Sequence, residues 1–149
     1  MQATTNTTNT NTPTTTLACR CGKVQLHISD APVAQFYCHC DDCRAVTGGA
    51  LAPMALFPAS AVQLAGGDTT EWTYRTTPRT RCAACGTLLF GEPPGLGMRG
   101  VSGFLLPPQM FKPQFHIRCQ QAVVAVKDEL PHYKDVPAAF GGTDETVAW

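Results

Sequence analysis

The residues of this sequence that most clearly carry chemistry are its eight cysteines. Seven of them fall into three short groups: Cys19-Arg20-Cys21, the segment 38–43 and Cys82-Ala83-Ala84-Cys85. No export signal is recognisable at the start, so we expect a cytoplasmic protein whose thiols stay reduced. Closely spaced cysteines in such a protein indicate metal binding or redox chemistry rather than a disulfide framework.

The group Cys82-Ala83-Ala84-Cys85-Gly86 has the pattern of a zinc knuckle. A two-residue spacer lets a tight turn aim both sulfurs at one ion, and Gly86 permits the positive φ that such a turn uses. The alternative is a thioredoxin-type redox pair, which needs a helix after the first cysteine. A strand-like segment follows here instead, and this favours zinc.

The pair Cys19 and Cys21 is separated by one residue. In an extended strand both side chains would point to the same face, so both thiolates could reach one metal. Together with Cys82 and Cys85 they would form a closed, tetrahedral, structural zinc site. The alternative is four unrelated buried thiols.

The segment 38–43 combines both spacings, and we expect Cys38, Cys40 and Cys43 to converge on one zinc. No fourth protein ligand is evident nearby, which is typical of a zinc that keeps an open position for water or a substrate sulfur. A thiol bound there would be deprotonated. His39 and Asp41 could close the site instead, but His39 lies between two ligands and should point away from the metal.

The surrounding sequence predicts a mainly β fold. Apolar and polar residues alternate in several segments, and twelve prolines and thirteen glycines leave no room for a long helix. We expect one short helix over 41–46, capped by an aspartate, and Pro53 indicates a sheet edge or a bulge. The expected strands cover residues 24–28, 33–38, 51–57, 71–75, 87–90, 99–105 and 115–119.

Residues 1–16 are almost all threonine and asparagine, so we expect a disordered tail over 1–16 and a single zinc-binding β domain over 17–149. Eleven basic residues balance eleven acidic ones, giving a formal net charge of zero. A nucleic-acid partner is therefore not expected, because phosphate binding needs a basic surface. No apolar segment is long enough to span a membrane, so no membrane partner is expected either.

The cysteine motifs resemble those of the glutathione-dependent formaldehyde-activating enzyme family, which includes centromere protein V. The similarity runs from about residue 17 to 137. It is carried by Cys19-x-Cys21-Gly22, Tyr37-Cys38-His39-Cys40-x-x-Cys43-Arg44, Thr47-Gly48, Cys82-x-x-Cys85-Gly86, His116-Ile117 and Asp128-Glu129-Leu130-Pro131. One departure is Ala122-Val123, where the family often has Pro-Trp.

The resemblance implies a zinc-stapled, β-tent-like fold of several antiparallel strands with two zinc ions per chain. Cys19, Cys21, Cys82 and Cys85 match the structural ligands, and Cys38, Cys40 and Cys43 match the catalytic ligands. The implied activity is that of a carbon–sulfur lyase, which interconverts glutathione and formaldehyde with S-(hydroxymethyl)glutathione. A small thiol such as glutathione is then the partner.

Three residues beside the expected catalytic zinc are candidates for binding substrate. Arg44 could hold a substrate carboxylate, or it could be a surface arginine near a helix end. Thr47 and Gly48 could let the backbone approach a ligand closely, or they could form an ordinary loop. A run of three arginines before the knuckle would suit an anionic substrate, or it could be a solvated strand face: Arg75, Arg79 and Arg81.

The remaining candidate residues receive simpler interpretations. Cys119 is expected to be a buried, inert thiol, and the alternative is that it supplies the missing fourth ligand. His27 and His132 carry no signal. The alternative to an enzyme is a non-catalytic, zinc-stabilised binding module of the same fold, which would not need a metal with an open position.

Overall fold

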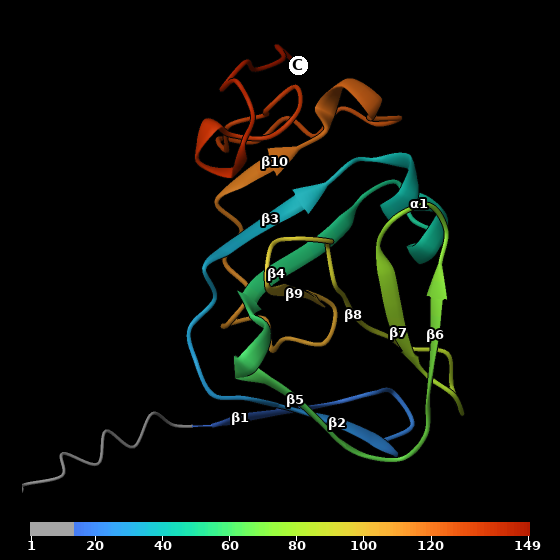
Figure 1. Cartoon of the computed structure of the whole chain (residues 1–149). Helices are drawn as coiled ribbons and strands as arrows, with labels where there is room; N and C mark the ends of the chain where they lie inside the picture. The colour runs from blue at the N-terminus through green and yellow to red at the C-terminus, as the bar shows by residue number, and fades with distance from the viewer. Residues whose placement is uncertain (1–13) are drawn as a thin grey trace, which may run out of the picture.

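A computed structural model describes residues 14–149, which form two β-sheets and one α-helix (Figure 1). Most of the tail expected over 1–16 lies outside the described residues. The first strand begins at Thr15, two residues before the expected start of the domain, because Thr15 and Thr16 pair with Ile28 and His27. No helix in the described part is long and apolar enough to cross a membrane.

The smaller sheet has three antiparallel strands in the order β1-β2-β5. These strands are β1 (Thr15–Ala18), β2 (Val24–Ile28) and β5 (Val62–Gly66). The alternating pattern of β2 predicted its position correctly. Strand β5 was not predicted, and it follows a short 3-10 helix, η1 (Ala59–Ala61).

The larger sheet contains seven strands. They are β3 (Ala34–Cys38), β4 (Ala52–Pro58), β6 (Thr69–Thr73), β7 (Pro78–Cys82), β8 (Leu88–Gly91), β9 (Met98–Ser102) and β10 (Phe115–Ile117). Their order is β10-β3-β4-β9-β8-β7-β6, and all neighbours are antiparallel except β10 and β3, which are parallel. The mainly β prediction is confirmed.

The main core lies between the two sheets. Val24, Leu26 and Ile28 on β2 are almost fully buried, and they cluster with Phe57 of β4 and Phe90 of β8. Burying a side chain of this size contributes about 1.5–3 kcal/mol. A second, smaller cluster surrounds β3 and includes Cys38. Each cysteine group therefore borders a packed core.

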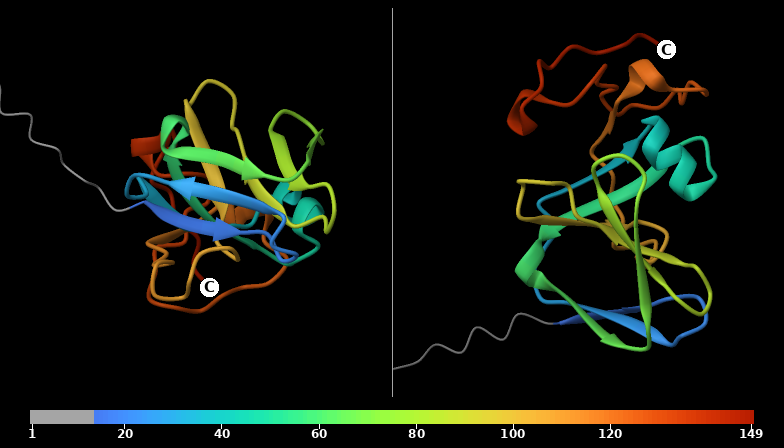
Figure 2. Two further views of the ribbon diagram at one scale, coloured as in Figure 1. Left: turned by 90° about the horizontal axis from the view of Figure 1, so that it is seen from below. Right: turned by 45° about the vertical axis from the view of Figure 1, so that its right-hand side comes forward.

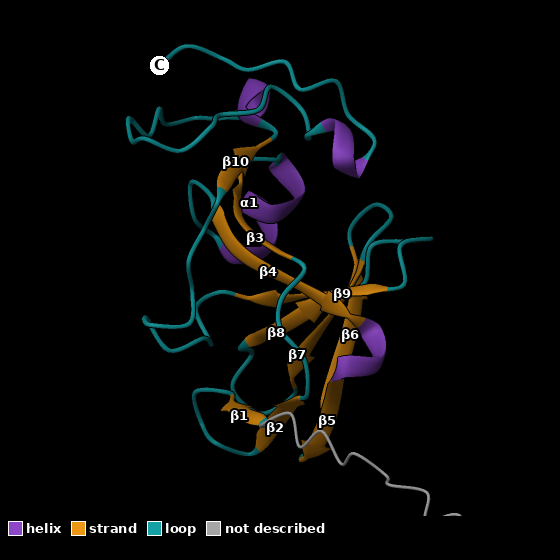
Figure 3. Ribbon diagram, turned by 90° about the vertical axis from the view of Figure 1, so that its left-hand side faces the viewer, coloured by secondary structure: helices purple, strands orange, loops and turns teal. Residues whose placement is uncertain are grey.

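The helix α1 (Asp41–Thr47) connects β3 to β4, as Figure 3 shows. The expected helix is confirmed, but its N-cap is the Cys40 side chain rather than an aspartate, because the Cys43 N–H points at the Cys40 sulfur at 3.3 Å. Gly48 ends the helix with a φ of 71°, a conformation that glycine adopts without strain.

Residues 118–149 form a mostly irregular segment beside β10 at the edge of the larger sheet (Figure 2). It contains two 3-10 helices, η2 (Cys119–Gln121) and η3 (Ala138–Phe140). The strand expected over 115–119 is shorter, because Arg118 has a φ of 57° and turns the chain away. Pro53, expected at an edge or a bulge, lies instead in the interior strand β4, where pairing with β9 begins only at Met54.

Candidate functional site

The structure brings Cys19, Cys21, Cys82 and Cys85 together, with their sulfur atoms all within 4.8 Å of one another. Cys19 follows β1 of the smaller sheet, and Cys82 ends β7 of the larger sheet. Two segments more than sixty residues apart in sequence meet here, so an ion bound by these sulfurs would join the two sheets.

Two tight turns present these four cysteines. Cys82–Gly86 is a turn in which the Gly86 N–H donates to the Cys82 carbonyl, and Gly86 has the expected positive φ, 73°. Cys19–Gly22 is also a turn, with Gly22 at a φ of 77°. The prediction of an extended strand for Cys19 and Cys21 was therefore wrong, because Gly22 closes a turn with Cys19.

The donor set of this four-cysteine cluster fits zinc. Tetrahedral zinc with Zn–S bonds of about 2.3 Å places its sulfurs about 3.8 Å apart. The Cys19 and Cys21 sulfurs lie 3.5 Å apart, and those of Cys21 and Cys82 lie 3.8 Å apart. A contact with the Thr87 hydroxyl at 3.0 Å lowers the pKa of Cys85 to about 5, which favours the thiolate that a metal requires.

The second cluster consists of Cys38, Cys40 and Cys43, whose sulfurs also lie within 4.8 Å of one another. Cys38 is the last residue of β3, Cys40 caps α1, and Cys43 lies in its first turn. The backbone of α1 therefore turns Cys43 back toward the strand end, and the Cys38 and Cys40 sulfurs lie 3.4 Å apart. His39 points away from the sulfurs, as expected, and is fully buried.

The electrostatics of this three-cysteine cluster are compatible with a bound cation. Hydrogen bonds from Cys38 and Cys43 lower the pKa of Cys40 to about 2, and the contact with Cys40 raises the pKa of Cys38 well above its ordinary value. One thiolate is thus stabilised by two neighbouring thiols. Three thiolates can coexist only with a bound cation, since like charges this close oppose each other's ionisation.

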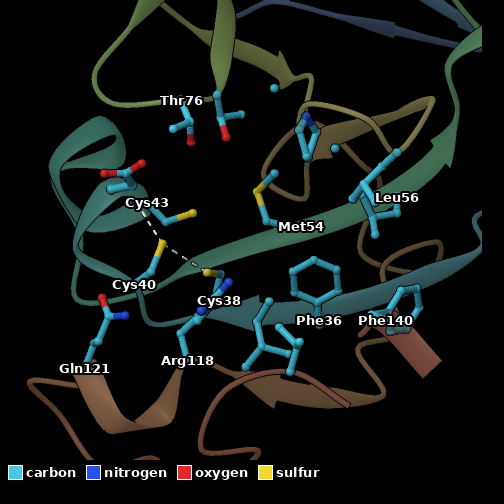
Figure 4. A pocket seen from close by; sticks show the side chains of 18 of the residues that line it. Phe36, Cys38, Cys40, Cys43, Met54, Leu56, Thr76, Arg118, Gln121 and Phe140 are labelled. Atoms are coloured by element: carbon cyan, nitrogen blue, oxygen red, sulfur yellow. Dashed lines mark hydrogen bonds between the residues drawn. The ribbon is translucent and has the colours of Figure 1, made fainter. Parts of the chain in front are cut away.

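The three-cysteine cluster opens into a cavity of about 490 Å³. Figure 4 shows Cys38, Cys40 and Cys43 at one end of the view and Leu56 and Phe140 at the other. The lining combines sulfur and polar or charged groups with hydrocarbon and includes Arg75, Arg79, Arg118, Gln121, Phe36, Met54, Leu56, Phe115, Ile117 and Phe140. The four-cysteine cluster contributes no residue to this cavity. A ligand in the cavity would therefore lie beside the three-cysteine cluster only.

The three arginines before the knuckle have separate surroundings. Arg75 pairs with Asp41 at 2.8 Å and thereby links the β6–β7 loop to α1. Arg81 donates to the backbone carbonyls of Val46 and Gly86. Arg79 is buried, lines the cavity, and donates to the Thr77 carbonyl at 3.1 Å.

The expected substrate-binding residues lie outside the cavity lining. The Arg44 guanidinium donates to the His39 carbonyl at 3.3 Å, and the Thr47 hydroxyl donates to the Cys43 carbonyl at 2.8 Å. Gly48 is the C-cap of α1. All three therefore serve the local structure of the helix that carries Cys43. The arginines that line the cavity are Arg75, Arg79 and Arg118.

A hydrogen-bonded chain of side chains lies behind the three-cysteine cluster. His39 Nε2 lies 2.8 Å from His116 Nδ1, and His116 Nε2 lies 2.9 Å from Asp128 Oδ2. His132 Nε2 contacts the other oxygen of Asp128 at 3.0 Å. The Trp149 indole packs on the imidazoles of His39, His116 and His132.

The direction of this chain follows from the buried His39 Nδ1, which has no hydrogen-bond partner in residues 14–149. A bare ring nitrogen is less costly there than an unpaired N–H, so we assign the His39 proton to Nε2. His39 then donates to His116, and His116 donates to Asp128, whose pKa these bonds lower although burial alone would raise it. The contact of His132 with Asp128 was not predicted, because no motif in the sequence around His132 indicates it.

Cys119 is buried in η2 and does not belong to the three-cysteine cluster. Burial raises the pKa of Cys119 to about 12. Its surroundings therefore match those of an inert, protonated thiol rather than those of a fourth metal ligand.

The fold and the two sulfur clusters define a mainly β protein whose cysteines are compatible with zinc. The chain belongs to the family described as glutathione-dependent formaldehyde-activating enzyme, whose model matches residues 14–121. This family agrees with the resemblance of the cysteine motifs, although the match ends before the segment 128–131.

A crystal structure of a Rhodobacter sphaeroides protein has a similar fold, with a TM-score of 0.54 and 20% sequence identity. The similarity covers 64% of this chain and 93% of that one, and at this identity it shows the fold alone. No curated protein matches the chain.

Proposed function

We propose that this protein is a zinc-dependent carbon–sulfur lyase that acts on a thiol–aldehyde adduct. The reaction would interconvert glutathione and formaldehyde with S-(hydroxymethyl)glutathione, or a related small thiol and aldehyde with their adduct. The observation that supports this proposal is the convergence of Cys38, Cys40 and Cys43 at the wall of a cavity of about 490 Å³. Family membership supports the link to glutathione and formaldehyde.

The seven clustered cysteines would hold two zinc ions with different roles. Cys19, Cys21, Cys82 and Cys85 would hold a structural ion, because four clustered sulfurs supply the full ligand number of a closed zinc site. Cys38, Cys40 and Cys43 would hold a catalytic ion with one position facing the cavity. Zinc bound there supplies a Lewis acid that favours the thiolate form of a substrate thiol.

In the direction of adduct formation, the thiol gives up its proton and its sulfur bonds to the carbonyl carbon of the aldehyde. The π electrons of the carbonyl move to oxygen, which takes up a proton, and the reverse steps release the aldehyde. The cavity would hold the two reactants next to each other, which contributes by proximity. Arg79 would place a positive charge beside the reacting thiolate, whereas Arg44, Thr47 and Gly48 would position the helix that carries Cys43.

The cavity favours an enzyme over a binding module. A module needs metal only for folding, and the four-cysteine cluster already joins the two sheets. A second sulfur cluster at the wall of a cavity of about 490 Å³ suits the binding of a small substrate.

The test is an NMR exchange measurement of adduct formation, with the uncatalysed rate subtracted. Zinc-loaded protein should accelerate exchange between a thiol and formaldehyde, and Cys40→Ser should abolish the acceleration. Cys119→Ala is the matched control, since it removes a thiol outside both clusters and should retain activity. A protein with two bound zinc ions and no acceleration with any thiol tested would favour the binding module.

A further inference from the structure

The cavity beside the three-cysteine cluster has two chemically different ends. Figure 4 shows the sulfurs at one end, whereas Phe36, Leu56 and Phe140 line the part that extends away from them. Phe36 stacks on Phe115 with ring centroids 5.7 Å apart, so this wall is held in place by packing. An apolar group of a ligand would lose water against this wall, whereas a peptide group there would lose its hydrogen bonds to water.

The positive charge of Arg79 acts on the sulfur end of the cavity, where it lowers the pKa of Cys40 and opposes the rise in the pKa of Cys43. Arg79 is 7% exposed, and within residues 14–149 it forms no ion pair with a carboxylate. The other two arginines of the cavity differ, since Arg75 pairs with Asp41 and Arg118 pairs with Asp135. A buried guanidinium is costly unless an anion faces it. The cysteine sulfurs supply part of this negative charge, and because Arg79 has no carboxylate partner, an anionic group of a ligand can supply the rest.

We propose that this cavity selects a small amphipathic thiol, whose anionic group lies on Arg79 and whose hydrocarbon or aromatic body lies along Phe36, Leu56 and Phe140. The reacting sulfur of this substrate lies at Cys38, Cys40 and Cys43, so the inference rests on the proposed function. Glutathione fits this cavity less well, because its peptide groups would lie against the apolar wall.

The proposal is tested with four probes that differ by one group each. Binding to the zinc-loaded full chain is measured by calorimetry for 2-mercapto-3-phenylpropanoate, for 2-mercaptopropanoate without the ring, for 2-phenylethanethiol without the carboxylate, and for 3-phenylpropanoate without the sulfur. The complete probe should bind at least about tenfold more tightly than the probe without the ring and the probe without the carboxylate. It should also bind more tightly than glutathione.

Variants assign each preference to its residue. Arg79→Gln should weaken the complete probe about tenfold more than it weakens 2-phenylethanethiol, which has no carboxylate, and Arg79→Lys should restore part of the loss. Phe140→Ala should weaken the complete probe and leave 2-mercaptopropanoate unchanged. Two exposed residues outside the cavity lining serve as matched controls and should change neither: Lys112→Gln and Phe104→Ala.

The outcomes separate this inference from the proposed function. If the protein accelerates adduct exchange but glutathione and 2-mercaptopropanoate bind as tightly as the complete probe, the amphipathic substrate is wrong and the lyase stands. If 3-phenylpropanoate binds as tightly as the complete probe and no thiol adduct is turned over, the lyase is wrong and the cavity preference stands. The probe series on the unchanged chain decides the matter even if an Arg79 variant fails to fold.

Discussion

His39 and His116 lie 77 residues apart in the sequence, and their buried rings meet with 2.8 Å between Nε2 and Nδ1. His39 separates Cys38 from Cys40, and His116 sits on β10 beside β3, so this bond connects the edge strand to the segment that carries the sulfurs. Asp128 extends the connection into the irregular segment 118–149. The position of the three-cysteine cluster thus depends on residues far along the chain.

Replacing His116 should loosen zinc at the three-cysteine cluster alone. His116→Phe keeps a ring in the core but removes the partners of His39 and Asp128, so the zinc affinity of this cluster should fall about 10- to 100-fold. The measurement is competition with a chelator, monitored by zinc release. His27→Gln is the control, because the side-chain hydrogen bond that His27 forms within the described residues is with Thr16, outside both clusters. Equal loss of affinity at both clusters in the His116 variant would contradict a local role.

Removal of one cysteine should have opposite consequences at the two clusters. Cys85→Ser should leave the chain unfolded, because the four-cysteine cluster joins the two sheets and binding of a structural zinc contributes about 10 kcal/mol or more to folding. Cys40→Ser should retain the fold, since its three ligands lie within one strand end and one helix turn. Circular dichroism and zinc analysis of both variants provide the measurement. Folded Cys85→Ser protein with one zinc would show that the sheets pack without the ion.

Cys119 should resist alkylation in the folded, zinc-loaded protein. Burial raises its pKa to about 12, so it should stay protonated and unmodified even at pH 9, where an ordinary cysteine is half ionised. Cys85 has an exposed side chain and should be alkylated at pH 7 once a chelator removes the zinc that protects it. Mass spectrometry after timed alkylation gives the order. Early modification of Cys119 would show that η2 opens readily.

The raised pKa of Cys119 also gives a sign for the pH dependence of stability. The unfolded chain loses this proton above about pH 9, whereas the folded chain keeps it up to about pH 12, so the free energy of unfolding should fall between these values. Cys119→Ala should show a smaller fall in urea titrations across this range.

The start of the domain can be tested by paired deletions. Removing residues 1–16 should lower the free energy of unfolding by about 1 kcal/mol more than removing 1–13, because it deletes the pairing of Thr15 and Thr16 with β2. Thermal and urea unfolding of the two proteins measure the difference. Identical stabilities would place the start of the folded domain at residue 17, as the composition predicted.

Local spacing determined which residues of this protein can hold metal. A pair of cysteines one or two residues apart stays close in space in a strand or in a turn, so the three groups were recognisable without a structure. The period-2 pattern of Val24, Leu26 and Ile28 and the short helix at 41–47 are local in the same sense. The position of His39 away from the sulfurs follows from its place between Cys38 and Cys40.

Tertiary structure alone decided what surrounds the sulfurs. In sequence Arg44 was the candidate for substrate binding, and Arg79 belonged to a run of arginines that could be a solvated strand face. The structure places Arg79 at a buried position on β7 beside the cavity, whereas Arg44 turns toward the His39 carbonyl. The contact of His132 with Asp128, at 3.0 Å, is evident only from the tertiary structure, in which residues 118–149 lie beside β10. Such contacts depend on how sheets and loops that are far apart in the sequence pack together. The spacing of residues within a short motif does not determine that packing.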